Sequence, residues 1–183
     1  WDGWMRELLA LQAEHPELAT PDSPTQRVGA PPSSGFEEVV HPVPMLSMGN
    51  VFDEDGLRAW YQRALDYLEI ESAPMVCELK IDGLALAVTY RDGVMERAAT
   101  RGDGERGEDV TANVRTIRSV PLALEGDGLT VPGVVELRGE VFFPNSKFAA
   151  LNTEREEAGL PAYVNPRNSA SGSLRQLDSA ETA

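Results

Sequence analysis

Cysteine and histidine are scarce in this sequence of 183 residues, which has one cysteine, Cys77, and two histidines. A single thiol cannot form an internal disulfide, and one Cys with two His cannot build a zinc site of thiolates. No run of about 18 apolar residues is present, so we expect no membrane-spanning helix. The first residues lack the basic and apolar blocks of a secretory signal, and we therefore expect a cytoplasmic protein.

Positive charge is also in short supply. There are 30 Asp and Glu against 16 Lys and Arg, a net charge of -14, and only Lys80 and Lys147 are lysines. This imbalance argues against broad binding of a phosphate backbone by these residues alone, and by itself it predicts an acidic, solubilising surface. Apolar residues make up 42% of the chain and are spread along it. That distribution excludes a disordered acidic tail.

The hydrophobic pattern divides the chain at a linker. Apolar residues recur at helical spacing over residues 4–14, and Pro16 ends the pattern. The sequence starts inside this pattern and without Met, so we interpret it as a piece of a longer protein. Gly, Ala, Pro and Ser dominate residues 28–35, which is typical of a linker. We place a domain boundary there, between residues 1–34 and 35–183.

Beyond the linker, helical and strand-like patterns alternate. Helices are predicted after Asp53, whose side chain can cap one, and over residues 110–117 and 145–158. Period-two patterns predict strands over residues 75–81, 84–90, 94–101 and 134–143. Asp92-Gly93 is a strong hairpin signal between the second and third of these strands. This order predicts an α+β fold with an antiparallel sheet.

Two of the predicted strands carry ionisable side chains on one face. Alternation groups Glu78 with Lys80 and Asp82, and it groups Glu136 with Arg138 and Glu140. An amphipathic sheet with cross-strand ion pairs on its wet side would also account for this pattern. Two glycines favour a pocket instead. Gly83 follows Asp82 at a tight bend, and Gly139 lies within the later strand, where it leaves room for a ligand or another backbone.

Lys80 is the candidate nucleophile of such a pocket. Its amine can attack a carbonyl or phosphoryl centre only after it loses a proton. Glu78 and Asp82 oppose that loss, because nearby negative charge favours the ammonium form. Desolvation, a bound metal ion or neighbouring arginines must counter them. The candidate arginines are Arg101, Arg138, Arg167 and Arg175.

Residues 77–83 (Cys-Glu-Leu-Lys-Ile-Asp-Gly) resemble the Lys-x-Asp-Gly motif of covalent nucleotidyltransferases, the DNA ligases and RNA capping enzymes. More specific blocks resemble the bacterial NAD-dependent DNA ligases and occur in that family's order. These blocks are residues 15–18, 20–29, 41–47, 100–104, 107–111, 138–142, 165–168 and 172–178. The resemblance implies a nucleotidyltransferase (adenylation) fold for residues 35–183, cut before the family's later motifs. It also implies the remnant of a small helical NAD-recognition subdomain for residues 1–34.

The resemblance implies an enzyme, a DNA ligase that uses NAD and acts in DNA replication and repair in the bacterial cytoplasm. Its expected partner is nicked double-stranded DNA, which it seals through a lysine-AMP intermediate with release of nicotinamide mononucleotide. NAD is the implied AMP donor, Mg²⁺ (or Mn²⁺) the implied helper through the phosphates, and Zn²⁺ is implied only beyond these residues. We expect residues 1–183 alone not to ligate.

The resemblance also assigns site residues. It makes Lys80 the residue that carries AMP and gives Asp82 a supporting role in metal or lysine chemistry. Glu78 is expected on the adenine side of the nucleotide. The other implied nucleotide-binding residues are Asp2, Ser47, Met48, Gly83, Arg101, Glu140, Arg167 and Arg175. Trp1 stands where the family has Tyr, and no metal ligand is expected within the chain.

Two alternatives stay open. An ATP- or GTP-dependent nucleotidyltransferase of the RNA ligase or capping type would share the Lys-x-Asp-Gly motif, although the block over residues 20–29 argues against it. A non-catalytic, acidic binding module would instead use its polar strand faces to contact a protein partner. In that case replacement of Lys80 by arginine would leave its binding activity intact.

Overall fold

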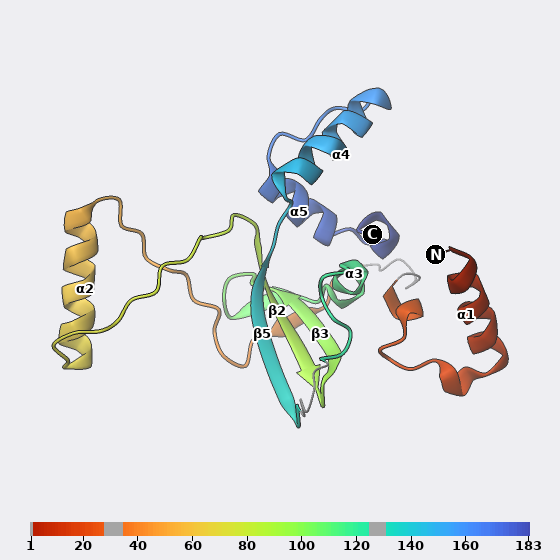
Figure 1. Ribbon diagram of the computed structural model, residues 1–183, viewed down its shortest axis with the longest axis horizontal. Coiled ribbons are helices and arrows are strands. Elements are labelled where there is room, and N and C mark those ends of the chain that lie inside the picture. Colours follow the sequence, from red (N-terminus) through yellow and green to blue (C-terminus); the bar gives the residue numbers. More distant parts are fainter. Residues whose placement is uncertain (1, 28–34, 125–130) are drawn as a thin grey trace. The chain divides into compact units, whose positions relative to one another are not determined.

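The computed structural model describes residues 2–27, 35–124 and 131–183 (Figure 1). The chain forms two compact units. One comprises Trp1–Pro44 together with Ile81–Ala183, and the other comprises Met45–Lys80. The first unit contains helices and two antiparallel sheets, which confirms the α+β prediction. Apart from Gly35, the predicted linker over residues 28–35 lies outside the described residues, as does Trp1.

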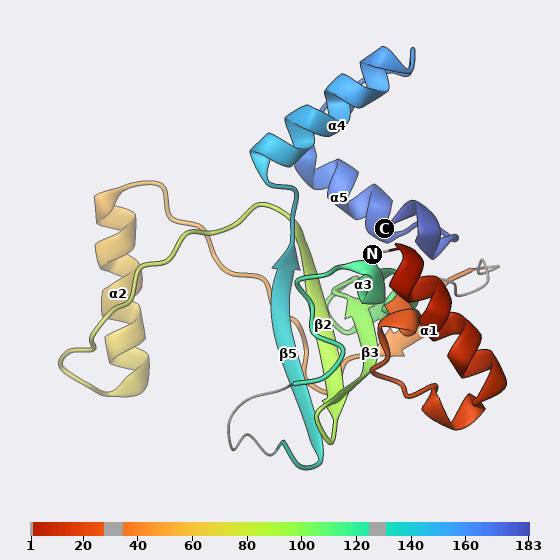
Figure 2. The ribbon, with the colours of Figure 1, turned by 45° about the vertical axis from the view of Figure 1, so that its right-hand side comes forward.

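A three-stranded antiparallel sheet organises the first unit (Figure 2). Its middle strand, β2 (Leu84–Arg91), pairs with β3 (Val94–Thr100) on one side and β5 (Val134–Val141) on the other. β2 and β3 are joined by Asp92 and Gly93, whose φ angles are 48° and 84°. Positive φ at both central residues is what a type I′ turn requires. The hairpin predicted from this dipeptide is therefore confirmed.

One face of this sheet carries the hydrophobic core. Leu86, Val88 and Tyr90 alternate along β2 and are buried against Val114 of α3 (Thr111–Thr116) and Leu174 of α5 (Pro166–Leu174). Each such side chain stabilises the fold by about 1.5–3 kcal/mol relative to exposure. The Tyr90 hydroxyl donates a hydrogen bond to the Pro121 carbonyl at 2.9 Å, and burial raises the pKa of this side chain. Helices α3 and α5 thus cover one face of the sheet, and the other face carries the buried Ala87 and Ala99 together with Glu136 and Arg138.

A second sheet joins two short segments that the sequence does not predict as strands. β1 (Glu38–Val40) pairs with β4 (Arg106–Glu108), which lies in a segment rich in Gly and acidic residues. Three residues are too few for an alternating pattern to be recognised. Gly107 in β4 packs directly on β3, because a Cβ there would lie 1.7 Å from the Thr100 carbonyl oxygen. The block over residues 107–111 therefore needs its glycine for close backbone packing.

Hydrogen bonds between polar side chains hold the first helix to the segment that follows it. α1 (Asp2–Glu14) is followed by two 3-10 helices, η1 (Pro16–Leu18) and η2 (Pro24–Arg27). The Gln12 amide donates to the Ser23 hydroxyl at 2.8 Å and accepts from the Thr25 hydroxyl at 2.6 Å. Both hydroxyl residues are buried. Ser23 and Thr25 thus hold the end of α1 through a polar network.

The C-terminal region contains α4 (Asn145–Glu157), α5 and the short η3 (Ser179–Glu181). The sequence does not predict α5, whose Ser, Asn and Gly are weak helix formers. It forms because Asn165 caps it, accepting a hydrogen bond from the Asn168 amide at 3.1 Å, and because Pro166 suits the first turn. Burial of Ala170 and Leu174 anchors its apolar face.

The second unit is built around α2 (Glu54–Leu68), which begins where the sequence predicts. The Asp53 carboxylate accepts a hydrogen bond from the Gly56 amide at 2.7 Å. The helix ends at Glu69, which adopts the left-handed conformation. The Tyr61 hydroxyl then ties the following loop to the helix, because it bonds to both the amide and the carbonyl of Ala73 at 2.9 Å.

The strand predicted over residues 75–81 is wrong. Residues 72–82 form neither helix nor strand, and the Val76 and Leu79 side chains are 81% and 89% exposed. The residues do alternate, but a strand is stable only when a neighbour pairs with its backbone groups. None of the strands in the described ranges pairs with this segment. Strand geometry therefore does not place Glu78, Lys80 and Asp82 on one face.

The other predicted elements are confirmed with small shifts of their ends. The strands over residues 84–91, 94–100 and 134–141 and the helices over 111–116 and 145–157 each lie within two residues of their predicted ends. Among the residues that the structure describes, no helix combines the length and apolar character needed to cross a membrane.

Candidate active site

The predicted site residues fall in both units. Lys80 is the last residue of the second unit, which also contains Glu78, Ser47 and Met48, and all four are exposed. The first unit holds Asp82, Gly83, Arg101, Glu140, Arg167 and Arg175, as well as Asp2, the first residue of α1. Within the described part of the first unit, contacts join predicted site residues that are distant in sequence. These contacts link Gly83 to Glu140 and Asp82 to Arg167.

Gly83 lies where β5 runs closely past the start of β2. It is buried, and its amide donates a hydrogen bond to Glu140 Oε1 at 3.2 Å. A Cβ at this position would lie 2.1 Å from the Val141 carbonyl oxygen and 3.0 Å from Glu140 Cγ. A side chain is therefore excluded by the backbone of the neighbouring strand, which explains the glycine of the Lys-x-Asp-Gly motif. Gly139 differs, because no described atom lies within 4 Å of the point where its Cβ would be.

Asp82 and Arg167 form an ion pair between the motif and α5. Their closest atoms, Oδ1 and Nε, are 3.6 Å apart, and both side chains are more than half exposed. Exposed pairs of this kind add little stability.

Two other candidate arginines are engaged by carboxylates elsewhere. Arg175 makes a bidentate contact with Glu108, with both nitrogen–oxygen distances at 2.7 Å. Arg138 pairs with Glu136 at 2.8 Å. The forked pair of Arg175 and Glu108 is specific in geometry as well as strong. Of the three arginine pairs, only that of Arg167 involves a carboxylate of the motif.

The side chain of Asp103 stabilises the turn that follows Arg101. Asp103 Oδ1 accepts hydrogen bonds from the amides of Glu105 at 2.9 Å and Arg106 at 2.8 Å. Gly102 and Gly104 adopt φ angles of 58° and 102°, which favour glycine. The two amide bonds lower the pKa of Asp103 below its ordinary value.

This turn has a measurable pH dependence. Because the pKa of Asp103 is lowered in the folded chain, its stabilising contribution is complete above the ordinary Asp pKa and is lost as pH falls through the lowered folded pKa. Carboxyl-carbon NMR titration should give a lower midpoint for folded Asp103 than for the same residue in urea. Asp103→Asn should remove the corresponding acid-side dependence of amide exchange at Glu105 and Arg106. Equal midpoints in the folded and unfolded chain would contradict this.

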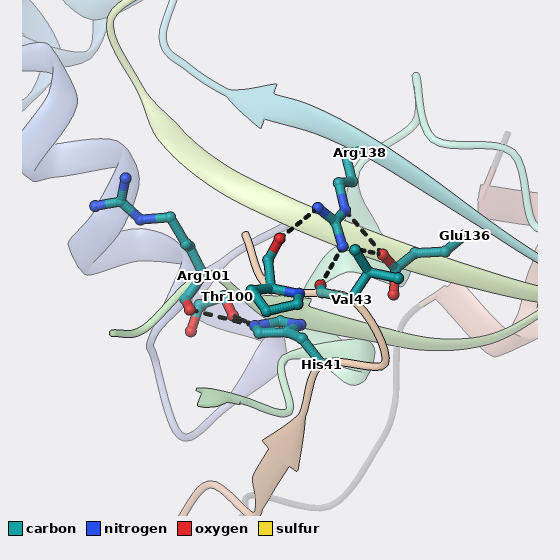
Figure 3. Close-up of polar contacts among 7 residues, drawn as sticks. His41, Val43, Thr100, Arg101, Glu136 and Arg138 are labelled. Atoms are coloured by element: carbon teal, nitrogen blue, oxygen red, sulfur yellow. Dashed lines mark hydrogen bonds and ion pairs between the residues drawn. The ribbon is translucent and has the colours of Figure 1, made fainter. Parts of the chain in front are cut away.

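His41 is a structural part of the site that sequence reasoning did not single out. It is buried, and its Nε2 lies 3.1 Å from the Thr100 carbonyl and 3.2 Å from the Arg101 carbonyl (Figure 3). Both partners are acceptors, so Nε2 carries the proton and donates. The only signal in the sequence was its place in the block over residues 41–47, because nothing local shows which carbonyls it meets.

The acidic residues do not form a metal site by themselves. Within residues 2–27, 35–124 and 131–183, no three His, Cys, Asp or Glu side chains are grouped closely enough to hold a metal ion.

Over most of its length the chain matches an adenylating domain. The family model described as NAD-dependent DNA ligase adenylation domain matches residues 33–183, and the model for the DNA ligase-like, N-terminal NAD+-binding domain matches residues 1–29. The chain therefore belongs to the NAD-dependent DNA ligase family. It is 55% identical to a DNA ligase of Thermomicrobium roseum and 54% identical to DNA ligases of Herpetosiphon aurantiacus and Cellvibrio japonicus. Each match covers 100% of this chain but only 26–27% of the relative, so the chain spans about a quarter of their length.

Proposed function

We propose that residues 1–183 are part of a bacterial NAD-dependent DNA ligase that seals nicks in double-stranded DNA during replication and repair. The observation that carries this proposal is the adenylation-domain match over residues 33–183, which includes the motif from Lys80 to Gly83. In this proposal residues 1–34 belong to the NAD-recognition subdomain and its linker, and residues 35–183 are the first part of the adenylation domain. Its place is the bacterial cytoplasm, where NAD and chromosomal DNA are both present.

Lys80 is the proposed nucleophile. Its deprotonated Nζ attacks the adenylyl phosphorus of NAD, a phosphorus–nitrogen bond forms, and the bond to the phosphate of nicotinamide mononucleotide breaks. The attacking nitrogen, positively charged once the new bond has formed, then loses one proton and holds AMP as a phosphoramidate. An oxygen of the DNA 5′-phosphate then attacks the same phosphorus and releases the lysine. Finally the 3′-hydroxyl attacks the activated 5′-phosphate, closes the nick and expels AMP.

The first-unit contacts support roles for residues around Lys80. Chain connection alone keeps the Lys80 Cα within about 11 Å of the Gly83 Cα, and Gly83 is fixed against β5. Glu140 bonds to the Gly83 amide and is exposed, so its carboxylate can also accept from a ribose hydroxyl. Asp82 supports the lysine chemistry, with its charge offset by Arg167.

The remaining assignments follow the family. We propose that Glu78, Ser47 and Met48 contact the adenosine side of NAD and that Asp2 contacts its nicotinamide side. Arg101 is assigned to ribose or phosphate, and Arg167 and Arg175 lie near the phosphates and DNA. The described residues do not group as metal ligands, so Mg²⁺ or Mn²⁺ is proposed to bind through the phosphates, where it would neutralise charge. Zn²⁺ is proposed only outside these residues.

Intact-mass measurement of the full-length protein with NAD and Mg²⁺, followed by addition of nicked DNA, tests this function. We expect one AMP adduct from NAD, none from ATP, and a sealed strand after DNA is added. Residues 1–183 alone should seal nothing and gain little or no adduct. An adduct from ATP but not from NAD would instead favour the RNA ligase or capping type. No adduct and no sealing would favour the non-catalytic binding module.

A further inference from the structure

Residues 41–44 form a short strap across the three-stranded sheet, on the face that carries Arg138. Their first side chain, His41, bonds to carbonyls at the end of β3, and their last carbonyls accept from Arg138 on β5 (Figure 3). β3 and β5 are the two outer strands, with β2 between them. Two strand spacings amount to about 10 Å, which is the reach of three extended residue steps. The strap is therefore just long enough to bridge the sheet from edge to edge.

Arg138 is committed to this strap. Its Nη1 donates to the Pro44 carbonyl at 3.0 Å, its Nη2 donates to the Val43 carbonyl, and its Nε donates to Glu136 at 2.8 Å. The planar guanidinium fork can meet two successive carbonyls and a carboxylate at once, which the single ammonium of lysine cannot do. The Arg138 charge is balanced by Glu136, whose side chain is 20% exposed. Arg138 is thus positioned to hold protein backbone rather than a phosphate.

The strap has the local stiffness that such a clamp needs. Pro42 and Pro44 each fix their own φ angle and favour extended backbone in the residue before them. Neither proline has an amide N–H that a neighbouring strand could pair with. The Val43 and Pro44 carbonyls accept from Arg138. At the other end, the His41 amide donates to the Glu105 carbonyl at 2.9 Å.

We propose that Arg138 and His41 are positioning residues that clamp residues 41–44 across the sheet, and that this clamp sets where the chain leaves toward Ser47 and Met48 and where the Arg101 backbone lies. The inference rests on the proposed function, since its effect is expected on NAD. Ser47 and Met48 follow Pro44 by three and four residues, and the Arg101 carbonyl is bonded to His41 directly. The clamp therefore holds the Arg101 backbone directly and fixes Pro44, the residue from which the chain continues toward Ser47 and Met48.

The decisive variant is Arg138→Lys in the full-length protein, which keeps the charge and loses the fork. We expect the KM for NAD in single-turnover adenylation to rise about tenfold, as for loss of one charge-assisted hydrogen bond, while kcat stays within about threefold. Arg91→Lys is the matched control, because Arg91 forms a similar forked pair with Glu96 in the same sheet but does not touch the strap. It should change neither parameter. A merely structural role would lower the fraction of active enzyme without moving KM.

A second variant and a second readout keep the inference falsifiable. His41→Gln should raise the same KM, and its effect should not add to that of Arg138→Lys if both act through one strap. An unchanged KM in a folded Arg138→Lys protein, or full additivity, overturns the clamp. If the wild-type protein forms no AMP adduct, the proposed function fails, and amide exchange at residues 45–48 then decides the clamp. Faster exchange in Arg138→Lys but not in Arg91→Lys supports it, and equal exchange in all three proteins overturns it.

Discussion

Replacing Lys80 with arginine is expected to abolish formation of the AMP adduct in the full-length protein. The guanidinium stays protonated and has no nitrogen lone pair to attack phosphorus, whereas an amine can lose its proton and attack. Adenylation should fall by about 10⁴-fold or more, the scale seen when a nucleophile is removed. Lys80 is exposed, so the replacement should leave folding unchanged. Intact mass after incubation with NAD measures the outcome.

The chain provides its own control for this experiment. Lys147, the second of its two lysines, is exposed in α4. Lys147→Arg should form the adduct at the wild-type rate, and a protease digest of the wild-type adduct should place AMP on the peptide that contains Lys80. A stable adduct on the Lys80→Arg protein would eliminate Lys80 as the nucleophile, and equal binding of a protein partner by both variants would favour the non-catalytic alternative.

Gly83→Ala is expected to cause the largest loss of stability of any small substitution in the motif. The new methyl group would lie 2.1 Å from the Val141 carbonyl oxygen, which belongs to the paired backbone of β5 and cannot move aside cheaply. We expect the free energy of unfolding to fall by about 2–3 kcal/mol, as for overpacking in a dense interior. Urea unfolding of residues 1–183 should show a lower midpoint with an unchanged slope.

Gly139→Ala is the matched control for stability, because Gly139 lies in the same strand pair, opposite Leu86, with open space where its methyl group would be. Its midpoint should be unchanged or slightly higher, since alanine restricts the unfolded chain. Equal midpoints for Gly83→Ala and the wild-type chain would show that the strands separate easily at this point, and the close approach would then not explain the glycine of the motif.

Features that depend on neighbouring residues were predictable from the sequence. The Asp53 cap and the Asp92-Gly93 hairpin are both set by contacts within four residues, and both are confirmed. The segment over residues 75–81 shows the limit of this reasoning. Its alternation describes which side chains would share a face, but pairing with another strand decides whether a strand forms, and alternation carries no information about that partner.

The sequence predicts which residues are candidates for the site, but it does not predict which residues they contact. Lys80 followed from the chemistry that a lysine can perform and from the resemblance of its motif. The partners of the arginines did not, since Arg175 could meet Glu108 only after α5 formed, and α5 itself was missed. His41 likewise acquires its role from Thr100 and Arg101, which are about 60 residues away in the sequence.

The bidentate pair between Arg175 and Glu108 also bears on the order of folding. It joins residues 67 positions apart, and the pairing of β1 with β4 includes a contact between Arg106 and Glu38 across 68 positions. Contacts of such long range form late, because closing the intervening loop costs entropy before any contact compensates for it. During synthesis from the N-terminus, the turn that carries Arg101 therefore remains incompletely braced until α5 has emerged from the ribosome. The segment from Arg101 to Glu108 is thus expected to be among the last parts of the first unit to become fully braced.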